Sequence, residues 1–243
     1  MRSLAASIAF LTRIPVPWGV RFSAEDVGKS ARWFPLVGLL IGGVYVVMMG
    51  VLGLCFPPGV VAVLIVLVEA LLTGALHMDA LADIADGFGG GNTREDILRI
   101  MRDHAIGSYG ATALILLVAL KVTVITALLQ RQQAVPYLIL APALGRWSIV
   151  PLCRFLSYAR ESRAVASHIG TAELVWASLI IAGAVAFAAP WRGLACWLAV
   201  AATSTWFGGL CFHKIGGITG DTLGANVQIS ESVVLLTGLA LSG

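Results

Sequence analysis

Charged residues are scarce in this sequence. Only 12% of its 243 residues are Asp, Glu, Lys or Arg, whereas 58% are hydrophobic, and the mean hydropathy is +0.91. This composition excludes an ordinary soluble domain and indicates an integral membrane protein. The net charge is only +3, and no basic patch with interleaved aromatic residues is present, so nothing indicates a nucleic-acid partner.

Paired cysteines are also lacking, and we expect no cleavable leader. The four cysteines are scattered through apolar segments without a CxxC pair, so we interpret them as small buried residues rather than as a zinc site or a disulfide framework. The first twenty residues superficially resemble a signal peptide. However, they contain Arg13, Pro15 and Pro17 and no small-residue cleavage site, which favours a retained helix at the membrane interface.

Long apolar runs divide the sequence into about six or seven predicted transmembrane helices. Their approximate limits are residues 34–56, 60–76, 110–129, 134–152, 174–189 and 193–212, followed by a short apolar piece from Val233. The predicted fold is therefore an all-α, polytopic membrane helical bundle that forms one domain over residues 1–243.

The basic residues predict the orientation of this bundle. Twelve of the sixteen lie on one side, in residues 1–33, 77–110, 154–173 and 213–231, and only Arg131 and Arg192 lie in the opposite turns. Because lysine and arginine accumulate on the cytoplasmic side, we expect the acidic region and the 213–231 loop to face the cytoplasm, in the bacterial cytoplasmic (inner) membrane.

The acidic residues concentrate in one stretch. Residues 77–110 contain six of the thirteen, and Asp79, Asp83 and Asp86 occupy a single narrow stripe of a helix. Carboxylates crowded in this way repel one another unless a cation binds them, and hard oxygen ligands suit Mg²⁺ held together with substrate phosphates. Gly87 and the glycines after it let the backbone approach a ligand closely. The alternative is a solvated helix end followed by a flexible loop.

A second polar segment, GGITGDTLGAN at residues 216–226, lies on the same predicted face. Its glycines free backbone N–H groups to bind an anion, and it matches neither the Walker pattern nor GxGxxG after a strand. The alternative is a glycine-rich turn. The predicted site residues here are Gly217, Thr219, Gly220, Asp221 and Asn226.

Several isolated polar residues extend the prediction. Arg102 and Arg146 are candidates to bind a phosphate. Alternatively, Arg102 is one of the positive charges expected on the cytoplasmic side, and Arg146 extends its side chain to the cytoplasmic edge of the membrane. Asp103 either completes the cation site or faces water. Glu69 and Lys121 lie within predicted spans, where we expect them to pair with each other.

Several of these segments, in this order, resemble the cobalamin synthase family, also called adenosylcobinamide-GDP ribazoletransferase. Met78, Ala80 and His104 depart from the family pattern, but none of them replaces a carboxylate. The matching segments are AFLTRIPVP (9–17), WFPLVG (33–38), HMDALADIADGFGGG (77–91), IMRDHAIGSYG (100–110), LGRW (144–147) and GGITGDTLGAN (216–226).

The resemblance implies a Mg²⁺-dependent phosphotransferase of the last stage of cobalamin synthesis. The 5′-hydroxyl of α-ribazole, or of its 5′-phosphate, would displace GMP from adenosylcobinamide-GDP. Asp79, Asp83 and Asp86 would be catalytic and bind the metal, one of them also acting as base, with Asp103 and Asp221 as further ligands. The predicted substrate-binding residues are Gly87, Arg102, Arg146, Gly217, Thr219, Gly220 and Asn226.

Two other functions remain as alternatives. A CDP-alcohol phosphotransferase shares the D-x-x-D-G core at Asp83–Gly87, but Gly90 and Gly91 stand where that pattern has Ala-Arg. A cation-coupled transporter would explain the charges within spans, but its acidic site belongs near the midplane. The sequence leaves open whether one or two metal ions bind, which carboxylate is the base, how the corrinoid is held, and whether the protein forms a homo-oligomer.

Overall fold

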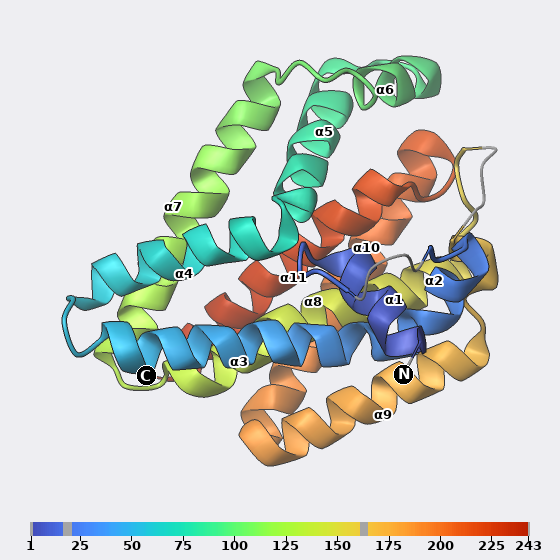
Figure 1. The fold of residues 1–243 in the computed structure, drawn as a ribbon. Coiled ribbons are helices and arrows are strands. Elements are labelled where there is room, and N and C mark those ends of the chain that lie inside the picture. Colours follow the sequence, from blue (N-terminus) through green and yellow to red (C-terminus); the bar gives the residue numbers. More distant parts are fainter. Residues whose placement is uncertain (1, 17–20, 161–164, 243) are drawn as a thin grey trace.

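The structure is a computed structural model that describes residues 2–16, 21–160 and 165–242, and it is a helical bundle (Figure 1). Within these residues it contains no β-strand, only an isolated bridge between Tyr158 and Ile218. The α-helices are α1 (Arg2–Leu11), α2 (Ala24–Ser30), α3 (Phe34–Leu52), α4 (Pro58–Thr73), α5 (Leu76–Gly90), α6 (Arg94–Ile100), α7 (Ser108–Gln130), α8 (Ala134–Phe155), α9 (Thr171–Ala188), α10 (Pro190–Ile215) and α11 (Gly220–Ala240).

Six helical segments are long and apolar enough to cross a membrane, which confirms the predicted polytopic all-α fold. They are Ala24–Leu52, Ser108–Gln130, Ala134–Phe155, Thr171–Ala188, Pro190–Ile215 and Gly220–Ala240. A seventh crossing results if α4 and α5, which meet at an angle of 91°, together form one broken span. Helix α5, which carries the three aspartates of the acidic stripe, lies outside the six.

The C-terminal part differs from the prediction. Residues 213–231 were expected to form a loop, but α10 continues to Ile215 and α11 begins at Gly220. The polar side chains of α11, among them Gln228 and Glu231, are buried against other helices instead of facing lipid. Their polarity lowers the mean hydropathy of α11 to 1.2, which is why the sequence pattern did not indicate a full membrane span here.

Helix α8 is the centre of the bundle, with α3 and α11 packed against it (Figure 1). Two glycines of α3 permit the close approach. A Cβ atom at Gly38 would lie 2.3 Å from the carbonyl oxygen of Pro142, and one at Gly42 would lie 2.6 Å from Cα of Ile139. Small residues at a helix–helix interface permit such close packing within a membrane.

A network of charged side chains is buried within the bundle. The Lys121 ammonium donates to Glu69 (2.6 Å), to Gln228 (2.7 Å) and to Glu231 (2.5 Å), and Arg146 donates to the other oxygen of Glu231. The pairing predicted for Glu69 and Lys121 is confirmed. Two carboxylates and two basic groups balance, so the interior holds no net charge from these four residues.

The sharp bend between α4 and α5 sets the direction of the acidic helix. Gly74 ends α4 with φ +63°, and Ala75 follows with φ +57°, so two consecutive residues are left-handed. The backbone N–H of Arg13 donates to the carbonyl of Leu72 (2.6 Å), and the Arg13 side chain covers Gly74. Figure 1 shows α5 leaving α4 at a steep angle towards α6 and α7.

Candidate active site

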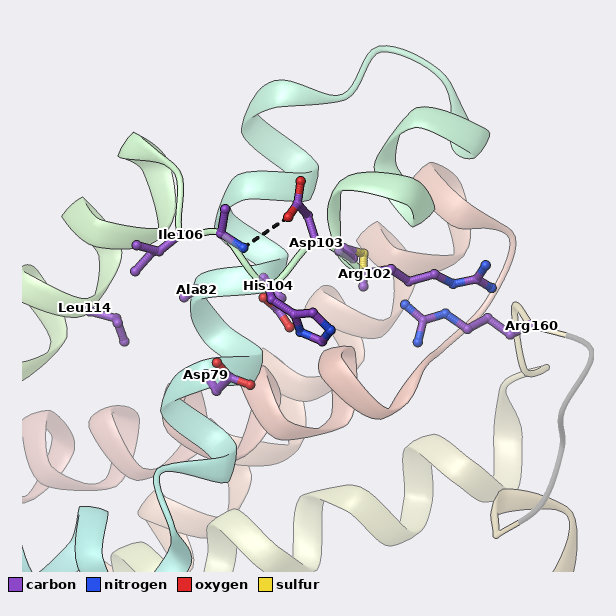
Figure 2. Close-up of a pocket in the computed structure, with 11 residues that line it drawn as sticks. Asp79, Ala82, Arg102, Asp103, His104, Ile106, Leu114 and Arg160 are labelled. Atoms are coloured by element: carbon purple, nitrogen blue, oxygen red, sulfur yellow. Dashed lines mark hydrogen bonds between the residues drawn. The ribbon is translucent and has the colours of Figure 1, made fainter.

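A cavity of about 380 Å³ lies beside the acidic stripe of α5. Its lining comes from α5, from the segment between α6 and α7, from Leu114 of α7, and from the segment after α8 (Figure 2). Asp79 and Asp83 contribute carboxylates, and Arg102 and Arg160 contribute guanidinium groups. Acidic groups that suit a cation and basic groups that suit phosphate therefore share one cavity.

Asp79 and Asp83 present carboxylates without a protein partner among the residues that the structure describes. Partial burial is the main cause that raises the pKa of Asp83 from 3.8 to about 6. Repulsion from neighbouring carboxylates, foremost that of Asp79, contributes in the same direction. A cation placed between the two carboxylates would relieve this repulsion.

Asp86, the third member of the stripe, is held by backbone groups. Its two oxygens accept hydrogen bonds from the N–H of Gly107 and of Gly110, each at 2.8 Å, at the first turn of α7. The carboxylate thus satisfies N–H groups that have no partner within the helix, and its charge is favourable at the positive end of the helix dipole. The structure therefore gives Asp86 a positioning contact between α5 and α7.

The other two predicted metal ligands also have protein partners. Asp221, at the start of α11, pairs with Arg160 at 3.0 Å. Asp103 accepts from the N–H of Ala105 at 3.1 Å and lines the cavity next to Arg102 (Figure 2). Both aspartates are near the cavity, but each is already engaged.

A Mg²⁺ ion fits the site only together with a substrate. Among the described residues, no three His, Cys, Asp or Glu side chains lie close enough to hold a metal ion by themselves. Mg²⁺ is typically bound by one or two carboxylates and completed by substrate phosphates and water. Asp79 and Asp83, which repel each other and have no partner among the described residues, are the pair that suits this mode of binding.

The contacts of the glycine-rich segment, residues 216–226, mainly stabilise the start of α11. Thr219 caps the helix by accepting from the N–H of Thr222, and Gly217 adopts φ +158° against the carbonyl of Ser157. The N–H of Gly220 donates to the Tyr158 hydroxyl at 3.1 Å. These contacts place Asp221 beside the cavity but leave only part of the backbone available to bind an anion.

Three predicted substrate-binding residues lie inside the bundle or against a neighbouring helix. Arg146 has no exposed surface and bonds to Glu231. Asn226 is equally buried, and its amide donates to Ser148 and Ser204. Gly87 faces α6, where a Cβ atom would come within 2.6 Å of Met101. The structure thus places these residues where they support the bundle.

The sequence interpretation did not identify Arg160 as a site residue. Its side chain reaches Asp221 and lines the cavity with Arg102, although the two arginines are far apart in the sequence (Figure 2). Arg94, at the start of α6, ties that helix to the segment after α8 and to the end of α10. It donates to the carbonyls of Ile215 and Ala159, each at 2.8 Å.

The sequence is similar to known proteins over nearly its whole length. The model of the family described as cobalamin-5-phosphate synthase matches residues 3–240. A protein of Ralstonia nicotianae named adenosylcobinamide-GDP ribazoletransferase is 39% identical over 98% of this chain and 95% of its own length. Proteins with the same name are 36% identical in Brevibacillus brevis, over 97% of each chain, and 38% identical in Shewanella frigidimarina, over 97% of this chain and 93% of theirs. No solved structure matches the chain.

Proposed function

The chain belongs to the cobalamin-5-phosphate synthase family, and we propose that it catalyses the reaction for which its relatives are named. In this reaction a ribazole, or its 5′-phosphate, receives the phospho-adenosylcobinamide group of adenosylcobinamide-GDP. The products are adenosylcobalamin, or its 5′-phosphate, and GMP. This membership favours the transferase over a CDP-alcohol phosphotransferase or a transporter.

The observation that carries the proposal is the cavity in which Asp79 and Asp83, unpaired among the described residues, lie together with Arg102 and Arg160. The 5′-hydroxyl oxygen of the acceptor attacks the phosphorus next to the cobinamide. A new P–O bond forms, the P–O bond to GMP breaks, and the hydroxyl proton passes to a carboxylate of the Asp79–Asp83 pair. Arg102 and Arg160 neutralise the diphosphate of the donor, since phosphoryl transfer depends mainly on positioning and electrostatics.

We propose Mg²⁺ as the cofactor, held by Asp79 and Asp83 together with the diphosphate. A bound Mg²⁺ ion would supply positive charge that stabilises the departing GMP. Asp86 orients this pair indirectly, by fixing α5 against the start of α7. We place the site on the cytoplasmic face of the bacterial inner membrane, because twelve of the sixteen basic residues flank that side.

The direct test uses the purified protein in detergent. It is given adenosylcobinamide-GDP, α-ribazole and Mg²⁺, and the release of GMP and the formation of cobalamin are followed. We expect GMP only when acceptor and metal are both present, and none after addition of a chelator. Turnover with CDP-activated donors in place of the corrinoid would contradict the proposal and restore the CDP-alcohol alternative.

A further inference from the structure

A second cavity, of about 260 Å³, lies next to the first on α5. Its walls are mainly apolar and come from α1, α5, α8 and α11, including Phe10, Leu76, Ile149 and Leu223. Two carboxylates lie at its edge. Asp221 lines only this cavity, whereas Asp79 lines both cavities. The apolar cavity therefore adjoins the proposed active site at Asp79.

We propose that this apolar cavity binds the aromatic base of the acceptor nucleoside, an inference that rests on the proposed function. The acceptor, a ribazole, consists of a flat, apolar benzimidazole-type ring on a ribose. Burying such a ring against aliphatic and aromatic side chains is favourable, and polar groups at the edge of the pocket then fix its orientation. The cavity offers this combination, with apolar walls and Asp79 at the boundary.

The sizes of the two substrates support the assignment. The cavity, of about 260 Å³, is slightly smaller than the about 300–1,000 Å³ that small-molecule pockets typically enclose, so it suits one small ligand. The donor joins a corrin ring to GDP and is far too large for it, and its diphosphate needs the arginines of the neighbouring cavity. Among the residues that the structure describes, no arginine or lysine lines the apolar cavity. The acceptor is therefore the substrate that fits.

The boundary between the cavities explains how the two substrates meet. With the base in the apolar cavity, the ribose extends towards Asp79, whose carboxylate accepts a hydrogen bond from the 5′-hydroxyl. The hydroxyl oxygen then faces the diphosphate held between Arg102 and Arg160. This arrangement orders the reactants in space before the transfer described above, which contributes to catalysis by proximity.

Substituting Leu76 tests the assignment. Its side chain is 45% exposed and lines the apolar cavity, so Leu76→Trp fills the cavity without disturbing the packed core. We expect at least a tenfold increase in the KM for α-ribazole, with the KM for the donor unchanged. Isothermal titration calorimetry of α-ribazole against the same variant should show an equal loss of affinity. Leu76→Ala, which keeps the cavity open, should raise the acceptor KM by a smaller factor.

Leu71→Trp is the matched control. Leu71 lies on α4, is 65% exposed and lines neither cavity, so the same enlargement there should leave both KM values unchanged. An unchanged acceptor KM in Leu76→Trp, or a rise in the donor KM alone, would overturn the assignment, and loss of a bound phospholipid from that variant would identify a lipid chain as the occupant. If the wild-type protein releases no GMP, the proposed function itself fails. The two failures are thus distinguishable.

Discussion

Removing the buried ammonium of Lys121 provides a quantitative test of the fold. This group is 1% exposed and donates to Glu69, Glu231 and Gln228, so Lys121→Met leaves two carboxylates with only Arg146 to balance them. Removing one partner of a buried ion pair costs about 3–5 kcal/mol, because the remaining charge is buried without compensation. We expect a loss of stability of this size.

A second substitution separates charge from packing. In the double variant Lys121→Met/Glu69→Gln, one carboxylate and Arg146 remain, so the buried charges balance again. We expect the double variant to regain about 2 kcal/mol of the stability lost in Lys121→Met, which is within the range of coupling energies between residues in contact. Gln228, which donates to Glu69 in the wild type, would still find an acceptor in the amide oxygen of the substituted side chain.

Unfolding of the purified protein in detergent, followed by circular dichroism, measures these differences. Lys29→Met is the control, because Lys29 forms an exposed i,i+4 pair with Glu25 whose loss should leave the stability nearly unchanged. A double variant no more stable than Lys121→Met would refute the reasoning, since unbalanced charge would then not be the cause of the loss.

The remaining predictions concern the active site. Asp83→Asn should lower turnover at least about 100-fold. Because the folded-state pKa of Asp83, about 6, exceeds its ordinary 3.8, the stability falls as the pH rises from about 3.8 to about 6, and at pH 7 this loss is complete, so the variant should melt at or above the wild-type temperature at pH 7. In the presence of adenosylcobinamide-GDP, added Mg²⁺ should raise the melting temperature of the wild type but not of Asp83→Asn, and an equal rise in both would contradict metal binding there. Asp86→Ala should lose both turnover and stability, and Gly110→Ala, whose Cβ atom would lie 2.3 Å from Asp86, should reproduce that loss in a melting experiment. Arg160→Gln should raise the donor KM about tenfold with little change in the acceptor KM; the reverse pattern would disprove its role beside the diphosphate.

The sequence predicted the number of spans and the acidic helix because both depend on local composition. Apolar runs of about twenty residues report a membrane span directly, and a period of 3.6 residues places Asp79 and Asp83 on one face. The sharp bend before this helix was less evident. It depends on left-handed conformations at Gly74 and Ala75, and the alanine gives no signal of such a conformation in the sequence.

Polar residues within spans were harder to interpret, because their meaning depends on what they face. In α11, Gln228 and Glu231 made the segment resemble a loop, yet they bond to Lys121 and so face the bundle interior. Arg146 carries a guanidinium group of the kind that binds phosphate, yet it is buried beside Glu231. In both cases the partner lies on a helix distant in the sequence, so no local pattern reveals it.

The stripe of three aspartates shows where periodicity stops being informative. Equal spacing predicts equal roles, but the structure engages Asp86 with the first turn of α7 and leaves Asp79 and Asp83 facing the cavity. The difference arises from Gly107 and Gly110, because a Cβ atom at either position would collide with the Asp86 carboxylate. Two glycines at the start of a long apolar helix, following an acidic stripe, therefore indicate a carboxylate that caps a helix. Such a residue holds the site in place, while its neighbours on the stripe remain available to a cation and a substrate.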